Sequence, residues 1–257
     1  MSSKKSTRYY RDLITELLKK EIKVRYKNNI LGYAWSILNP LAQAMVFFVA
    51  FQYILKIKIE NYVLFLILGL FPWQWFLNSV IASSVSMISN ANLIKKTIFP
   101  REYIVYAGVL NDMVHFVLSL PVLILFLVVY QQPIHFPQIL LFPALVVIQL
   151  FVTLGLALLV ASVNVFFRDL ERLVAILLNM LFYATPIIYA IGMIPAKLQF
   201  IIYLNPLTLL IINYRNIFLY GDVHWKYFFL SAAYALGIFL FGYITFNRLK
   251  SRFAEVL

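Results

Sequence analysis

Long apolar runs are the feature that most constrains the fold of this chain. Stretches of about twenty residues with almost no charge recur between residues 34 and 246, and about twenty apolar residues are enough for a helix to cross a bilayer. The runs do not alternate between polar and apolar residues, as the strands of a transmembrane barrel do. Hydrophobic residues make up 63% of the chain and charged residues 12%, against about half and about a quarter in soluble domains. The sequence therefore predicts an all-α integral membrane protein.

Six membrane spans are expected, and the charges between them indicate their orientation. With the N-terminus in the cytoplasm, 17 of the 22 Lys and Arg residues fall in cytoplasmic segments, which is the bias of positive-inside topology. Both termini are therefore expected in the cytoplasm, in a multi-pass protein of the cell inner membrane. Asp169 is placed to cap the helix of the fifth span. The expected spans are 34–55, 62–85, 104–130, 139–166, 173–190 and 225–246.

Residues 191–222 are apolar but are not expected to form a continuous span. Asn205–Pro206 breaks any helix there, and the pieces on either side are too short to cross about 30 Å. Arg215 would also lie deep in lipid. We expect two short re-entrant or surface helices on the outer face, between spans five and six. The alternative is a kinked seventh span, which would move the basic C-terminus outside, against the charge rule.

The chain divides into a cytoplasmic N-terminal segment, 1–33, and a transmembrane domain, 34–257. Residues 8–27 predict an amphipathic helix with Tyr10, Leu13 and Leu17 on one arc and charged residues on the other. Such a helix lies in the membrane interface, with its cations toward the headgroups. The net charge of +12 is accordingly interpreted as cations held near anionic lipid rather than as a nucleic-acid surface.

Residues for nucleotide, metal or catalytic chemistry are not evident. No Gly-Lys pair occurs, which excludes a phosphate-binding loop of the usual kind. There is no cysteine, and His115, His135 and His224 fall in separate segments, so a metal site is not expected. Asp112 lies inside the third span, where a structural role is expected and a proton relay is the alternative. A membrane-embedded glycosyl- or acyltransferase is therefore the weaker hypothesis.

Four stretches together resemble the membrane permease subunit of ABC-2-type exporters for O-antigen, capsule and teichoic-acid polysaccharides. The resemblance implies a homodimer that forms one pore for a lipid-pyrophosphate-linked glycan. It also implies two separate ATPase subunits that hold ATP and Mg, so that this chain is not an enzyme and carries no cofactor. The alternative within the superfamily is an exporter of drugs or small lipids. The stretches are RYKNNILGYAWSILNPL (25–41), LGLFPWQWF (68–76) with ANLIKKTIFPRE (91–102), NVFFRDLERLV (164–174), and YATPIIY (183–189) with YLNPLTLLIINYR (203–215).

The resemblance assigns ATPase coupling to the loop between the second and third spans. A short helix capped near Asn92 and stopped by Pro100 is expected there, with Phe99 as the anchor in a groove of the ATPase. The apolar residues Leu93, Ile94, Ile98 and Phe99 are expected to be exposed, with cations around them. An ordinary cytoplasmic loop is the alternative. The predicted coupling residues are Asn92, Leu93, Ile94, Lys95, Lys96, Ile98, Phe99, Pro100 and Arg101.

Two further sets of residues are assigned to the substrate. Lys23, Arg25 and Lys27 are candidates for the lipid pyrophosphate, with Leu31–Gly32 as the bend into the membrane; a general membrane anchor is the alternative. Aromatic residues, 17% of the chain, can stack on sugar rings along a pore, and indoles in mid-membrane need a polar partner. Helix packing is the alternative for each of these aromatic residues. The predicted path comprises Tyr33, Trp35, Phe47, Phe51, Trp73, Trp75, Phe182, Tyr183 and Tyr189.

Overall fold

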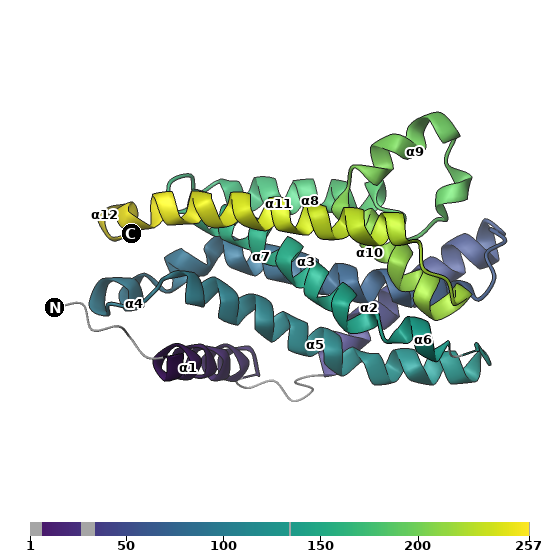
Figure 1. Ribbon diagram of the computed structural model, residues 1–257, viewed down its shortest axis with the longest axis horizontal. Coiled ribbons are helices and arrows are strands. Elements are labelled where there is room, and N and C mark those ends of the chain that lie inside the picture. The colour runs from purple at the N-terminus through teal and green to yellow at the C-terminus, as the bar shows by residue number, and fades with distance from the viewer. Residues whose placement is uncertain (1–6, 27–33, 134, 257) are drawn as a thin grey trace.

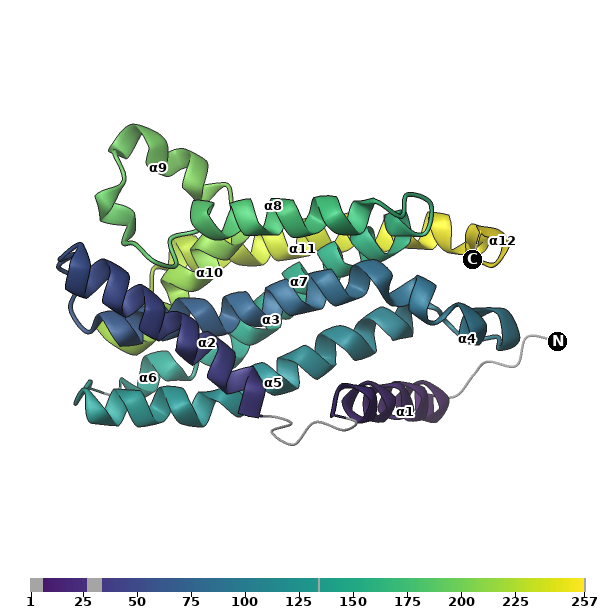
Figure 2. The same ribbon diagram turned by 180° about the vertical axis from the view of Figure 1, so that it is seen from behind.

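The computed structural model describes residues 7–133 except 27–33, and residues 135–256; every regular element in these ranges is a helix. Long helices run side by side along the molecule, with α3 among them (Figure 1). The short helices α4 and α12 lie at one end of this bundle, and α9 projects at the other (Figures 1 and 2). The elements are α1 (Thr7–Tyr26), α2 (Ala34–Phe47), η1 (Phe48–Ile54), α3 (Tyr62–Ser89), α4 (Ala91–Lys96), α5 (Glu102–Val129), α6 (Phe136–Ile139), α7 (Phe142–Asn164), α8 (Leu170–Ala184), η2 (Ile191–Met193), α9 (Ala196–Tyr203), α10 (Pro206–Arg215), η3 (Asn216–Tyr220), α11 (Trp225–Leu249), η4 (Lys250–Arg252) and α12 (Phe253–Val256).

Five helical segments in the described ranges are long and apolar enough to cross a membrane. They match the predicted first, second, third, fourth and sixth spans. The count rises to six if α9 and α10–η3, which are bent by 103°, are taken together as one broken span. The five segments are Ile37–Ile54, Tyr62–Ser89, Glu102–Val129, Phe136–Asn164 and Trp225–Arg252.

The predicted fifth span differs from the helix observed there. The predicted span covers 173–190, whereas α8 ends at Ala184. Its 15 residues extend over only about 22 Å, less than the ~30 Å hydrocarbon core. Pro186 explains the early end, because a residue before proline is pushed out of the helical region, and Thr185 has an extended backbone (φ −95°, ψ 136°). The predicted span is too long because residues 185–190 are mostly apolar without being helical.

The α3 helix is the centre of the bundle. Its sequence is apolar on nearly every side, and a helix of that kind is stable only when other helices surround it. It contacts α2, α5, α7, α8 and α10, and most of its residues from Tyr62 to Phe76 are buried. The aromatic and polar groups of the candidate sites are therefore arranged around α3.

Two glycines bring α7 and α11 into backbone contact. A Cβ atom built on Gly242 would lie 1.9 Å from the carbonyl oxygen of Gly155, and one built on Gly155 would lie 2.6 Å from the backbone of Ile238. Small residues allow helices to approach in this way where no hydrophobic force drives association in lipid. Gly155 and Gly242 therefore determine the spacing of the fourth and last predicted spans.

The segment between α8 and α11 contains the two short helices that the sequence predicts. The side-chain oxygen of Asn205 accepts a hydrogen bond from the backbone N–H of Leu207 at 3.0 Å, and Pro206 occupies the first helical position, where its missing N–H is not needed. The two helices differ in burial: α9 has no buried residue, whereas most of α10 is buried and packs against α3, α7 and α11.

Arg215 is buried inside the bundle. It is 4% exposed, and its guanidinium donates hydrogen bonds to the carbonyl oxygens of Phe65 (3.0 Å), Pro186 and Ile187 (2.7 Å). The guanidinium carbon also lies 3.3 Å from the centre of the Phe65 ring. Backbone oxygens and an aromatic face thus replace the water that a buried cation loses.

The α1 helix begins and ends within one residue of the predicted helix 8–27 and packs along α5. Leu17 is buried, and the Tyr10 ring stacks on that of Tyr103 with centroids 5.7 Å apart. Arg8, Asp12 and other residues of the charged arc are exposed. The apolar arc therefore faces α5, and the position of α1 relative to a membrane stays a prediction.

Candidate functional site

The coupling segment, residues 91–101, contains a helix shorter than predicted. α4 begins at Ala91 and ends at Lys96, and its N-cap is Asn90 rather than Asn92. The Asn90 side chain does not cap α4, because its amide donates back to the Ser86 carbonyl at 2.8 Å. Thr97 ends the helix in an extended conformation, three residues before Pro100, which is therefore not the residue that stops it.

The apolar residues of the coupling segment do not all face outward. Ile94 is 4% exposed, and Phe99 is partly buried against the same apolar cluster, which includes Met87 and Ile104. The prediction of exposure is therefore wrong for Ile94, and Leu93 and Phe99 are only partly exposed. Ile98, by contrast, is 95% exposed.

The cations of the coupling segment also separate into two groups. Asn92, Lys95 and Lys96 are exposed, and Leu93 and Pro100 are half-buried. Arg101 turns inward, where its guanidinium donates a hydrogen bond to the Lys250 carbonyl oxygen. The outward surface of this segment consequently comprises Asn92, Lys95, Lys96, Thr97 and Ile98.

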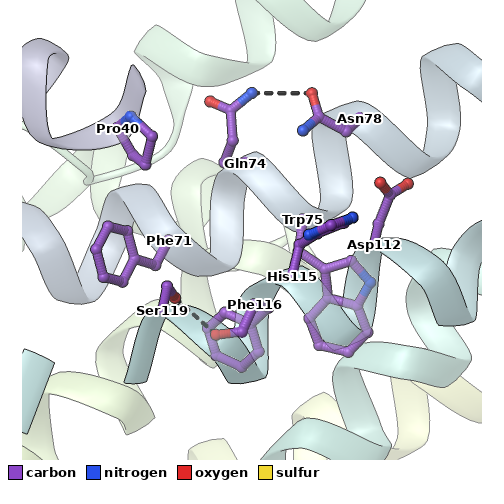
Figure 3. A pocket seen from close by; sticks show the side chains of 9 residues that line it. All are labelled: Pro40, Phe71, Gln74, Trp75, Asn78, Asp112, His115, Phe116 and Ser119. Carbon is purple, nitrogen blue, oxygen red and sulfur yellow. Dashed lines mark hydrogen bonds between the residues drawn. The ribbon is translucent and has the colours of Figure 1, made fainter. Parts of the chain in front are cut away.

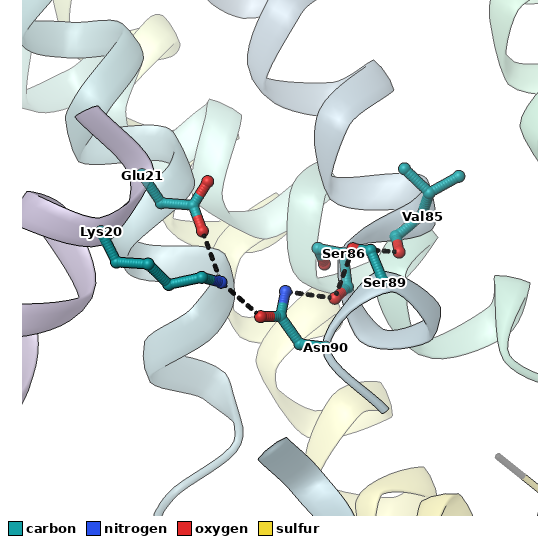
Figure 4. Close-up of polar contacts among 6 residues, drawn as sticks. All are labelled: Lys20, Glu21, Val85, Ser86, Ser89 and Asn90. Atoms are coloured by element: carbon teal, nitrogen blue, oxygen red, sulfur yellow. Dashed lines mark hydrogen bonds and ion pairs between the residues drawn. The ribbon is translucent and has the colours of Figure 1, made fainter. Parts of the chain in front are cut away.

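A polar network links α1 to the junction of α3 and α4 (Figure 4). The Lys20 ammonium lies 2.5 Å from the Asn90 side-chain oxygen and 3.2 Å from the Glu21 carboxylate. Ser86 and Ser89 line the same pocket, which has a volume of about 290 Å³. The sequence prediction missed Lys20, since its position in α1 does not reveal that it meets a residue seventy positions away.

The predicted headgroup residues are described only in part. Lys23 is exposed on α1. Arg25 belongs to α1, but its side chain lies outside the described structure. Lys27, Leu31 and Gly32 lie outside the described residues, as does Tyr33 of the predicted substrate path.

Five of the predicted path residues form one aromatic cluster where α2–η1, α3 and α8 meet. Phe47 contacts Phe51 (ring centroids 6.0 Å apart) and Phe182 (5.8 Å). Phe182 also contacts Trp73 at 5.5 Å and Tyr183 at 5.2 Å. Trp73 is 2% exposed and Tyr183 is 64% exposed, so the cluster runs from the bundle interior to its surface.

The remaining residues of the predicted path lie at the margin of the aromatic cluster or apart from it. The Tyr189 hydroxyl donates a hydrogen bond to the Tyr183 carbonyl oxygen at 3.0 Å, and Trp35 is half-exposed on α2. Trp75 is apart from the cluster: its indole N–H donates to the Val109 carbonyl oxygen at 3.3 Å and its ring stacks on Phe116. The polar partner of the Trp75 indole is thus a backbone carbonyl of a neighbouring helix in this chain.

A small polar cavity of about 40 Å³ lies beside Trp75, between α2, α3 and α5 (Figure 3). Asp112, His115 and Ser119 are buried in its wall, and the Gln74 amide donates to the Asn78 side-chain oxygen at 2.9 Å. The Ser79 hydroxyl donates to Asp112 at 3.0 Å. The volume suits about three water molecules, so these groups form a polar site inside two predicted spans.

Two buried amides were missed from the sequence. Asn164, not Asp169, supplies the side-chain bond at the start of α8, accepting from the backbone N–H of Glu171 at 3.1 Å. Gln149 donates to the Pro72 carbonyl oxygen at 2.8 Å and accepts from the Tyr214 hydroxyl at 2.9 Å. Their only sequence signal is a polar side chain within an apolar run, which does not identify the partner.

Comparison with known proteins supplies a family. Residues 12–219 match the family model of the ABC-2 type transporter. An O-antigen export system permease protein of Klebsiella pneumoniae is 42% identical over 251 residues, which cover 97% of this chain and 96% of that protein. One of Myxococcus xanthus is 35% identical, with 81% of each chain covered. A polysialic acid transport protein of Escherichia coli is 25% identical, with 76% of each covered.

The family match covers most of the chain and agrees with the observed fold. Several long apolar helices make up the bundle. No group of three or more His, Asp or Glu side chains suited to a metal occurs in the described part of the chain. The family is one of transporter permeases rather than enzymes. The chain is therefore a multi-pass membrane permease that belongs to the ABC-2 type transporter family.

Proposed function

We propose that this chain is the membrane subunit of an ATP-driven exporter that moves a lipid-linked polysaccharide across the inner membrane, as in O-antigen export for lipopolysaccharide biosynthesis. The observation that carries the proposal is the 42% identity to an O-antigen export permease over 97% of the chain. A more distant polysaccharide relative, the polysialic acid transport protein, supports the same substrate class. The aromatic cluster around Phe182 offers the flat rings that stack on sugars.

The proposed assembly is a homodimer with two ATPase subunits, which bind ATP and Mg in place of this chain. The support for a second copy is the large apolar surface on α2–η1 and α8, which includes Met45, Tyr53, Met180 and Tyr183. Exposed apolar side chains of this kind face either lipid or another protein surface. The pore would lie between the two copies, so that Tyr183 and Trp35 meet the glycan from both.

The proposed topology has six crossings and both termini in the cytoplasm. The short α8 is counted as the fifth crossing because it packs against α3 and α7 and lies along the bundle with them (Figure 2). The segment after Ala184, buried from Thr185 to Ile188, would complete that crossing. α1 would lie in the interface, with Lys23, Arg25 and Lys27 near the lipid pyrophosphate and Leu31–Gly32 as the bend.

The coupling segment is proposed to dock on the ATPase through Ile98, with Lys95 and Lys96 at the rim. An interface needs an apolar centre surrounded by polar groups, and Ile98 is the most exposed apolar side chain of the segment. Ile98 replaces Phe99 as the proposed anchor, because Phe99 packs against the inner apolar cluster. ATP binding and hydrolysis on the partner would then bias the pore between closed and open states.

Deleting the gene for this chain in its own host tests the proposed function. Surface polysaccharide should disappear while lipid-linked glycan accumulates inside spheroplasts, and a plasmid copy of the chain should restore both. In a host that also lacks the gene for the ATPase subunit, the plasmid copy should restore neither. Normal surface polysaccharide, together with altered resistance to drugs, would instead assign the chain to small-molecule export.

A further inference from the structure

The chain after α11, residues 250–256, packs into the same core as the coupling segment. Phe253 is fully buried, and its ring lies 5.4 Å from that of Phe246 and 6.2 Å from that of Phe166. The apolar cluster that holds Phe253 also contains Ile94, and Phe99 packs against it. α12 and α4 are in contact and lie at the same end of the bundle in both views (Figures 1 and 2). Residues 250–256 are thus part of the support beneath the coupling segment.

Polar contacts fasten the same two segments together. Arg101 donates a hydrogen bond to the Lys250 carbonyl oxygen, and its guanidinium carbon lies 5.9 Å from the centre of the Phe253 ring. The Lys250 ammonium lies 3.5 Å from the Glu102 carboxylate. Arg101 ends the coupling segment and Glu102 begins α5, so these contacts join three elements at one point. The Arg101 bond is charge-assisted and partly buried, which makes it stronger than a surface contact.

We propose that residues 250–256 form a seat that positions the coupling segment for the ATPase. The seat would hold the inner side of the segment through Ile94, Phe99 and Arg101, while Lys95, Lys96 and Ile98 face the partner. Because the seat continues α11 and Glu102 starts α5, a push on the coupling segment would move both helices together. The inference rests on the proposed function, in which an ATPase docks at this segment.

A spin label at the docking surface tests the seat directly. The chain has no cysteine, so Ile98→Cys provides a single labelling site. Arg101→Gln and Phe253→Ala remove the polar and apolar parts of the seat, and the matched control is Arg252→Gln, an exposed residue of the same segment. The label should become more mobile in both seat variants and stay unchanged in the control.

ATPase binding is the second readout, measured by co-purification from chains without the label. Retention should fall about tenfold in Arg101→Gln, the factor expected for one lost charged contact, and it should also fall in Phe253→Ala. Arg252→Gln should retain the ATPase. Thermal unfolding identifies any variant that does not fold, and Arg101→Gln carries the test if Phe253→Ala fails, because it leaves the apolar cluster unchanged.

Unchanged mobility of the label in folded Arg101→Gln and Phe253→Ala would overturn the seat proposal. So would lost ATPase binding without label motion, since that result assigns Arg101 to direct contact with the ATPase. Neither readout uses a substrate, so a failure of the seat proposal can be distinguished from a failure of the proposed function. If the seat variants show the mobile label and lost ATPase binding while the parent chain exports no polysaccharide, the seat proposal stands and the proposed function is wrong.

Discussion

Arg215 shows how a single residue connects three parts of the bundle. Its guanidinium bonds carbonyl oxygens of α3 and of the segment after α8, where the helix has ended and carbonyls need partners. Gly69 leaves the room for it: a Cβ there would lie 3.0 Å from Arg215 Nη2. The cation therefore belongs to the architecture of the bundle rather than to its surface charge.

Replacing Arg215 should destabilise the protein far more than replacing an exposed cation. Arg215→Met leaves the carbonyls of Phe65, Pro186 and Ile187 without their donor, which should cost on the order of 3 kcal/mol. Arg248→Gln, at an exposed position, should stay within about 0.5 kcal/mol. Thermal unfolding in detergent measures both. Equal midpoints for the two variants would show that the Arg215 bonds contribute nothing net.

Ile98 and Phe99 are neighbours with opposite surroundings, so their variants should fail in different ways. Ile98→Ser should leave folding intact and weaken ATPase association by on the order of 2 kcal/mol, if Ile98 is the centre of the interface. Phe99→Ala should lower thermal stability, because it opens a gap against the apolar cluster. Ile244→Ser, exposed on α11, is the control. ATPase co-purification unaffected by Ile98→Ser would place the docking site elsewhere, with α1 next to be tested.

The helices differ in how they make contact, and glycine spacing accounts for one of the closest approaches. α7 and α11 meet backbone to backbone at Gly155 and Gly242, whereas α8 presents many apolar side chains outward. α11 carries another glycine, Gly237, where an added Cβ atom would have no neighbour within 4 Å. The two glycines of α11 thus form a natural pair for comparison.

Adding one methyl group should separate the two helices only at the contact site. Gly242→Ala forces the α7 and α11 backbones apart and should cost about 1–3 kcal/mol. Gly237→Ala meets no neighbour and should be neutral or stabilising by up to about 1 kcal/mol, because alanine favours helix. Thermal unfolding midpoints of the two variants decide the matter. If Gly242→Ala is as stable as the parent, the α7–α11 spacing is looser than the contact distances indicate.

The whole molecule has two distinct ends. α4 and α12 mark one, and α9 marks the other (Figure 1). Lys95, Lys96, Arg168, Arg172 and Arg248 are exposed on α4, on the turn before and the start of α8, and near the end of α11. Cations concentrate on the cytoplasmic side of membrane proteins, which supports a cytoplasmic location for the α4 end.

Single cysteines in this cysteine-free chain should report which end is outside. Cysteines at Lys197 and Asp222 should react with a membrane-impermeant maleimide on intact cells, and those at Lys96 and Ser251 only after permeabilisation. Lys197, Asp222, Lys96 and Ser251 are all exposed, so accessibility within the protein does not limit the reaction. Labelling of the Ser251 position from outside would contradict six crossings and favour α9 with α10–η3 as an additional span.

The sequence by itself determined the class of the protein, the break at Asn205–Pro206 and the family. Apolar runs of membrane length predict five of the spans, and Asn205–Pro206 separates α9 from α10 as predicted. These features are local, because they depend on chain length, hydropathy and the missing N–H of proline. Each of the four quoted stretches is likewise local in the chain, and together they identified the ABC-2 type transporter family.

Only the tertiary structure decided which way each side chain faces. Arg215 meets Phe65 across 150 positions, and Arg101 meets Lys250 across 149. Helices that are apolar all round carry no signal of which face meets which neighbour, so Trp73 and Trp75 could not be told apart from the sequence. For the same reason Ile94 and Ile98 looked alike, although packing against Phe253 and its neighbours buries the first and leaves the second exposed.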